Sequence, residues 1–98
     1  MDILNHIDDQ RVGHIQINRA ERKNSLTTAM YQTMADLLRS YDADDNVRVI
    51  LLYGLPEMFC AGNDLSDFLA NPLSGSDSPV VQFLYALRDL QKPLVVSV

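Results

Sequence analysis

Apolar and polar residues alternate at the start of the chain in the pattern of a β-hairpin. Residues 2–8 alternate loosely and residues 12–17 alternate clearly, with a polar turn at 8–11 between them. Residues that alternate in a strand point to opposite faces of the sheet, so Ile15 and its apolar neighbours share one face. His14 lies on the other face, where we expect a half-exposed strand residue.

Apolar residues then repeat every three or four positions in two segments, which predicts two amphipathic helices. The first covers about 28–41, with Thr27 or Thr28 as the N-cap, and the polar residues 42–46 end it. Its apolar stripe consists of Met30, Met34, Leu37, Leu38 and Tyr41. The second begins at Pro79, which suits the first helical position behind Ser78. Its stripe consists of Val80, Phe83, Leu84, Leu87 and Leu90.

The remaining segments complete an α/β pattern. Residues 47–53, VRVILLY, predict a strand covered on both faces, as in a parallel sheet, and residues 94–98 predict a second one. A short helix is expected from Asp64 onward, and the Pro-, Gly- and Ser-rich residues 71–79 predict a mobile loop. The order ββ-α-β-α-α-β gives one α/β domain with parallel pairing between the later strands.

Length and charge exclude several classes of protein. Ninety-eight residues form one domain, and 47% of them are hydrophobic, so the chain is not disordered. The net charge of −5 argues against non-specific nucleic-acid binding, which depends on neutralising phosphates. No apolar run approaches the roughly 20 residues of a membrane span, and the N-terminus lacks the pattern of a secretory signal. The single cysteine fits a reducing, cytoplasmic location.

Candidate side-chain chemistry is sparse. Two histidines and one cysteine, far apart in sequence, do not make a zinc site, so no metal or cofactor is expected. Cys60 has no neighbouring base in the sequence, so we expect a small buried packing residue and not a nucleophile. Asp64 and Asp67 lie three residues apart on a first helical turn. They are either paired carboxylates or, more often in such positions, capping and solvated residues.

The turn after the first buried strand is more informative. Residues 58–68 read MFCAGNDLSDF, and Gly62 has no Cβ, so a ligand can approach the main chain there. Backbone N–H groups at the start of a helix lack internal partners and carry partial positive charge. The N–H of Asn63 is therefore a candidate for stabilising a developing oxyanion. The alternative is structural: Gly62 serves the turn and Asn63 caps the helix.

Four segments together resemble the crotonase superfamily, the enoyl-CoA hydratase/isomerase family. They are INRAERKNSL at 17–26, VRVILLYG at 47–54, MFCAGNDLSDF at 58–68 and KPLVVSV at 92–98. The resemblance implies a crotonase-like (ClpP/crotonase) spiral of ββα units acting on acyl-CoA thioesters, with CoA as part of the substrate. Ala20 replaces the usual proline of the first motif, and Asn63 replaces the commoner alanine or glycine. The GNDLxxF pattern also resembles an enoyl-CoA isomerase branch of the family.

The resemblance also implies roles by position. Asn63 falls where the family supplies the first oxyanion-hole N–H, with Gly62 beside it. Residues implied in CoA binding are Arg22, Lys23, Ser25, Ala61, Asp64 and Leu65. The cationic segment 19–23, which alone would read as a solvated charged turn, then suits the phosphates of CoA.

Family members are longer than this chain, so the resemblance implies that residues 1–98 are the N-terminal part of a crotonase-like domain, truncated or cleaved after Val98. The second oxyanion donor and the acid/base carboxylates are then expected beyond Val98. The alternative is a non-catalytic fragment that binds CoA or a partner. We expect a trimer-type homo-oligomer or a complementing second polypeptide. We also expect residues 94–98 not to form a bare sheet edge.

Overall fold

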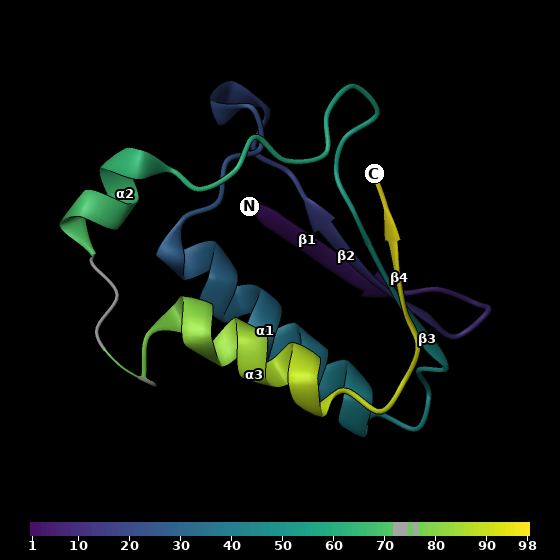
Figure 1. Ribbon diagram of the computed structural model, residues 1–98. Helices are drawn as coiled ribbons and strands as arrows, with labels where there is room; N and C mark the ends of the chain where they lie inside the picture. The colour runs from purple at the N-terminus through teal and green to yellow at the C-terminus, as the bar shows by residue number, and fades with distance from the viewer. Residues whose placement is uncertain (72–74, 76) are drawn as a thin grey trace.

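The computed structural model describes residues 1–71, 75 and 77–98, and it contains one mixed sheet of four strands (Figure 1). The strands, in their order across the sheet, are β1 (Ile3–Ile7), β2 (Val12–Ile17), β3 (Val49–Tyr53) and β4 (Leu94–Ser97). β1 pairs with β2 antiparallel, and the two later pairings are parallel. The helical elements are the 3₁₀ turn η1 (Ala20–Arg22), α1 (Thr28–Ala43), α2 (Leu65–Ala70) and α3 (Pro79–Asp89). The predicted α/β order and the hairpin are confirmed.

α1 and α3 lie side by side on one face of the sheet, and α2 lies beyond the N-terminal end of α1 (Figure 1). The core forms between these two helices and the sheet, because the apolar stripes of the helices meet the apolar face of the strands. Its largest fully buried apolar side chains are Ile15, Ile17, Ile50, Met34 and Leu38. Each such side chain contributes about 1.5–3 kcal/mol of burial free energy.

The other face of the sheet carries no helix of the described chain. On it His6 and His14 stack with ring centroids 4.1 Å apart. His14 bonds Asp8 through Nε2 at 2.8 Å and the hydroxyl of Tyr53 through Nδ1 at 3.0 Å. The hydrogen bond from His14 is the main cause that lowers the pKa of Asp8, whose carboxylate also accepts the backbone N–H of Val12. His14 is therefore a half-exposed strand residue, as predicted, and it ties the hairpin turn to β3.

This open face corrects the prediction that the first buried strand is covered on both sides. In β3 only Ile50 is fully buried, and the flanking positions are half-buried. β3 lies between β2 and β4 in the sheet. Side chains of these neighbouring strands partly shield the face of β3 that no helix covers. The apolar run VRVILLY is thus explained by the central position of β3 in the sheet together with the helices that cover one of its faces.

The helix termini agree with the sequence, with one extension. The hydroxyl of Thr27 accepts the N–H of Met30 at 3.2 Å, so Thr27 rather than Thr28 is the N-cap of α1. Ser78 and Pro79 begin α3 as predicted. α1 continues two residues past the predicted end, because Lys92 donates its Nζ to the carbonyls of Tyr41 and Asp44.

Two predictions about loops and edges have a partial outcome. The predicted mobile loop at 71–79 lies partly outside the described residues. β4 pairs with β3 along one edge, whereas its other edge has no strand partner in residues 1–71, 75 and 77–98. Val95 and Val96 are 50% and 46% exposed. Within the described chain residues 94–98 therefore form a bare sheet edge, contrary to the expectation, and a complementing second polypeptide stays a prediction.

Gly13 tests how tightly α1 sits on the sheet. A Cβ at this position would lie 2.7 Å from Cδ2 of Tyr41. The Tyr41 ring cannot retreat freely, because its hydroxyl donates to the carbonyls of His14 and His6 at 3.0 and 3.3 Å. We expect Gly13→Ala to lower the free energy of unfolding by about 1–3 kcal/mol in urea denaturation. Asn5→Ala, at an exposed strand position, is the control; an equal loss in both variants contradicts the clash.

Candidate functional site

The candidate site is built on the segment that follows β3. Gly54 lets the chain fold back on itself, because a Cβ there would meet the carbonyl oxygens of Phe59 and Met58 at 2.6 and 2.7 Å. Leu55 and Met58 exchange two backbone hydrogen bonds across this tight turn, at 2.8 and 3.2 Å. The turn directs residues 59–63 back across the loop that precedes α1.

Leu26 holds the segment on both sides of Asn63. The N–H of Leu26 donates to the Gly62 carbonyl at 2.8 Å, and the Leu26 carbonyl accepts the N–H of Asp64 at 2.8 Å. The N–H of Asn63 belongs to the same peptide as the Gly62 carbonyl, and in a trans peptide these two groups point in opposite directions. The bond to Leu26 therefore aims the Asn63 N–H away from the protein backbone. Within the described part of the chain this N–H has no acceptor.

Gly62 opens the approach to that N–H. Its φ of +103° lies in a region that favours glycine, and no atom lies within 4 Å of the place where a Cβ would stand. Ala61, Gly62 and Asn63 are all exposed. The structural alternative is correct for Gly62, which serves the turn, but wrong for Asn63, because the N-cap of α2 is Asp64.

Asn24 joins the two loops from the inside. Its side chain is fully buried, and it donates Nδ2 to the carbonyls of Ile17, Met58 and Phe59 at 3.1, 3.3 and 3.0 Å. Its Oδ1 accepts the N–H of Arg19 at 2.7 Å. Asn24 has a φ of +56°, a left-handed conformation that asparagine tolerates better than most residues. One side chain thus fixes both the cationic loop and the start of the 59–63 segment.

Asp64 is the charged centre of the site. Its carboxylate is buried and lies 2.9 Å from Nη1 of Arg19 and 3.4 Å from Nη2 of Arg22. It also accepts the N–H of Asp67 at 3.1 Å, which caps α2. This backbone bond, followed by the bond from Arg19, holds the pKa of Asp64 below its ordinary value. The carboxylate is therefore committed to the loops and to α2.

Asp67 caps a different helix. Its Oδ2 accepts the N–H of Thr28, in the first turn of α1, at 2.7 Å. Asp64 and Asp67 are thus not a pair of reacting carboxylates, and the capping interpretation is correct, although Asp64 is buried rather than solvated. Cys60 is half-buried rather than buried, and its Sγ accepts the N–H of Gly62 at 3.3 Å.

The residues implied in CoA binding lie around this framework. The pairing of Leu26 with Asn63 brings residues 22–26 beside residues 61–64. Arg22 and Lys23 are exposed, Ser25 is half-buried, and Leu65 is 76% exposed at the start of α2. The cationic segment is more than a solvated turn, because Arg19 is largely buried and also donates to the Ser25 carbonyl at 3.2 Å.

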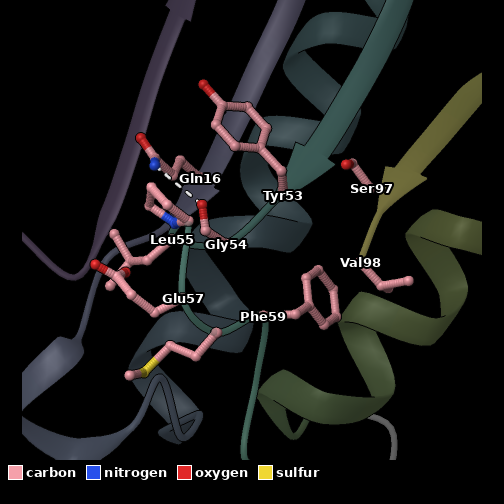
Figure 2. Close-up of a pocket in the computed structure, with 10 residues that line it drawn as sticks. Gln16, Tyr53, Gly54, Leu55, Glu57, Phe59, Ser97 and Val98 are labelled. Carbon is pink, nitrogen blue, oxygen red and sulfur yellow. Dashed lines mark hydrogen bonds between the residues drawn. The ribbon is translucent and has the colours of Figure 1, made fainter.

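A separate pocket of about 440 Å³ lies at the carboxyl ends of the parallel strands (Figure 2). It is lined by residues from the ends of β2, β3 and β4 and by the turn at 54–58, and Gln16 donates to the Gly54 carbonyl at 3.0 Å on its wall. Phe59 is the link between this pocket and the candidate site, since it lines the pocket and begins the segment that leads to Asn63. None of the predicted site residues lines this pocket.

Sequence reasoning missed three structural roles in the site: the buried ion pair of Arg19, the buried hydrogen bonds of Asn24, and the bond from Tyr31 to the Asn63 side chain. Arg19 and Asn24 belong to the motif at 17–26, but the sequence does not reveal that their side chains are buried. Tyr31 lies on the predicted first helix, and its contact with Asn63 depends on how that helix packs. Among the described residues no three His, Cys, Asp or Glu side chains gather as metal ligands, and no helix is long and apolar enough to span a membrane.

The sequence matches the family described as Enoyl-CoA hydratase/isomerase over residues 8–98. It is 39% identical to the 1,2-epoxyphenylacetyl-CoA isomerase of Escherichia coli (strain K12), in an alignment that covers 98% of this chain and 39% of the relative. It is 34% identical to a probable peroxisomal enoyl-CoA hydratase of Arabidopsis thaliana, covering 86% of this chain and 32% of the relative.

Solved structures agree in fold. OdaA of Pseudomonas aeruginosa superposes with a TM-score of 0.92 at 39% identity, covering 99% of this chain and 39% of that chain. An enoyl-CoA hydratase/isomerase of Pseudoalteromonas atlantica T6c gives a TM-score of 0.89 at 37% identity, covering 100% and 39%. The chain thus spans about two fifths of the length of these proteins.

Asp64 makes stability depend on pH in a defined direction. A carboxyl group with a lowered folded pKa contributes stability above its unfolded pKa of about 3.9 and loses it as pH falls through the folded value. We expect the free energy of unfolding of the wild type to fall below about pH 4 more steeply than that of Asp64→Asn, measured by urea denaturation across this range. Asp89→Asn, which removes an exposed partner of Arg88, is the control and should change the slope less. Equal slopes in the wild type and Asp64→Asn would contradict the assignment.

The role of Asn24 in joining the two loops is tested by removing its carboxamide. Asn24→Ala leaves buried carbonyl groups and the Arg19 N–H without partners, so we expect a loss of at least about 2 kcal/mol in the free energy of unfolding. Asn18→Ala is the matched control, since Asn18 donates only to the Met1 carbonyl at an exposed position. A cost below that of Asn18→Ala would show that Asn24 does not join the two loops.

Proposed function

The chain belongs to the enoyl-CoA hydratase/isomerase family, and from this premise we propose that it carries the first donor of an oxyanion hole for acyl-CoA thioesters. The donor is the backbone N–H of Asn63. The observation that supports it best is that Leu26 engages the Gly62 carbonyl and the Asp64 N–H while the Asn63 N–H is exposed and without an acceptor in the described chain.

The chemistry of the proposed site follows from charge development. Hydration of an enoyl thioester and a shift of its double bond both pass through an enolate-like species with negative charge on the thioester oxygen. A preoriented N–H stabilises that charge without reorganising, and loss of one such donor costs on the order of 10²–10³ in rate. A complete oxyanion hole needs a second N–H donor. The family resemblance places that donor in the turn that follows the strand equivalent to β4. We assign only the first donor to residues 1–98.

The CoA moiety is proposed to lie along the cationic loop. Arg22 and Lys23 project from an exposed turn beside residues 61–63, and the ammonium of Lys23 has no hydrogen-bond or ion-pair partner among the described residues. Ser25, Ala61 and Leu65 border the same surface. The buried Arg19–Asp64 pair fixes the loop that carries these cations. An acidic chain with a net charge of −5 needs such a local patch to hold phosphate groups. A trimer-type assembly, which the family resemblance implies, and a cytoplasmic location, which the single cysteine fits, are further parts of this proposal.

The proposal is tested by titrating ¹⁵N-labelled protein with butyryl-CoA and with free CoA. We expect butyryl-CoA to shift the amide proton of residue 63 downfield, because that N–H gains a carbonyl acceptor, while free CoA shifts only signals of the cationic loop. No change at residue 63 with saturating butyryl-CoA would refute the oxyanion role.

The phosphate-binding part is tested by charge removal. Lys23→Gln is expected to weaken CoA binding about two- to fivefold, since an exposed charge pair contributes about 0.5–1 kcal/mol. The difference should shrink at high salt. Arg48→Gln is the control, because Arg48 is an exposed cation at the opposite end of β3. Equal weakening in the two variants would indicate a general effect of net charge.

A non-catalytic CoA-binding fragment is the second candidate, because the chain spans about two fifths of its relatives and we assign it one donor. Calorimetric binding of butyryl-CoA without turnover of crotonyl-CoA by residues 1–98 favours this candidate. Turnover by the isolated chain would refute it.

A further inference from the structure

The side chain of Asn63 has a partner of its own. The hydroxyl of Tyr31, on α1, donates to Oδ1 of Asn63 at 2.6 Å. Oxyanion donation uses only the backbone of Asn63, so nothing in the proposed chemistry requires this carboxamide. The contact links residue 63 to the helix layer, whereas Leu26 links it to the preceding loop.

Tyr31 is well placed to act as an anchor. Its ring meets the rings of Phe83 and Phe68 edge-on, with centroids 5.4 and 6.3 Å apart, so it is wedged between α3 and α2. Burial is the main cause that raises the pKa of Tyr31, so its hydroxyl stays protonated and remains a donor at neutral pH. The ring is half-buried and packs against the core.

The backbone around Asn63 needs such an anchor. Gly62 precedes it with a φ of +103°, and no atom lies within 4 Å of the place where a Cβ would stand, so the main chain meets less steric resistance to rotation there than at a residue with a Cβ. Leu26 binds the carbonyl of the Gly62–Asn63 peptide and the N–H of Asp64, and neither of these hydrogen bonds involves the side chain of residue 63. A rotation at Gly62 would turn the Asn63 N–H away from its outward direction.

We propose that Tyr31 is a positioning residue for the oxyanion donor: by binding the carboxamide of Asn63 it holds the backbone N–H of that residue in its outward orientation. The catalytic role of this positioning rests on the proposed function. The restraint of residue 63 by Tyr31 rests on the structure alone. It also gives a reason for an asparagine at position 63. Alanine or glycine there would supply the same N–H without the tether.

The experiment compares Tyr31→Phe, Asn63→Ala and the double variant in the whole chain. Tyr31→Phe keeps the ring and removes only the donor, and Asn63→Ala keeps the backbone N–H and removes only the acceptor. Tyr85→Phe is the matched control, since the Tyr85 ring lies under Arg88 on α3 and its hydroxyl bonds no described group. All four variants are checked for folding by their amide spectra.

The first measurement is the ¹⁵N order parameter of the residue 63 amide without ligand. We expect it to fall from a rigid value of about 0.85 toward about 0.6 in both single variants, with no further fall in the double variant. Tyr85→Phe should leave it unchanged. An unchanged order parameter in both single variants, or effects that add in the double variant, would overturn the inference.

The second measurement is the preference for butyryl-CoA over free CoA, together with the carbonyl stretching frequency of the bound thioester. We expect each single variant to lower the preference about fivefold and to shift the frequency toward that of the free thioester, with CoA affinity unchanged. If the wild type shows no carbonyl shift, the proposed function fails while the order parameter still decides whether Tyr31 restrains residue 63. If the wild type shows the shift and Tyr31→Phe retains all of it, the positioning role is refuted.

Discussion

The pairing of Leu26 with the backbone around Asn63 is the constraint on which the rest of the site depends. Two loops that are 37 residues apart in sequence meet through two short backbone hydrogen bonds, and these use the groups on either side of one N–H. The unpaired N–H is left outside because a trans peptide directs its carbonyl and its N–H oppositely. This short β-bridge thereby leaves one backbone N–H without an acceptor in the described chain.

Buried polar groups make this pairing possible. The carboxamide of Asn24 satisfies carbonyl groups of both loops, and Asp64 neutralises Arg19 while capping α2. Removing one member would leave the others unpaired in a region shielded from water, which is costly. Some residues of types suited to acid/base or phosphate chemistry are thus structural: Asp64 and Arg19 support the loop that carries Arg22 and Lys23.

The sheet divides the molecule into two faces with different roles. The helix layer on one face carries the core and, through Tyr31, reaches the candidate donor. The other face holds the stacked histidines and the Asp8–His14–Tyr53 bonds, which fix the hairpin to β3. β4 leaves one edge unpaired in the described chain, and the solved relatives continue well past the matched region. The described chain therefore presents a folded framework around the candidate donor.

The sequence by itself determined the order of elements, the hairpin, the start of α3 at Ser78 and Pro79, and the segment around Gly62 and Asn63, because these depend on local periodicity, the preference of proline for the first helical position, and a recognisable motif. It left the N-cap of α1 open between Thr27 and Thr28. It could not decide that β3 is covered on one face, since a central strand and a doubly covered strand share the same apolar run. Nor could it separate the roles of Asp64 and Asp67, whose partners Arg19 and Thr28 come from distant segments. Tertiary structure alone decided that the Asn63 N–H has no acceptor in the described chain and that Tyr31 binds the Asn63 side chain, because both follow from which groups the packing of α1 and the Leu26 loop brings within hydrogen-bond distance.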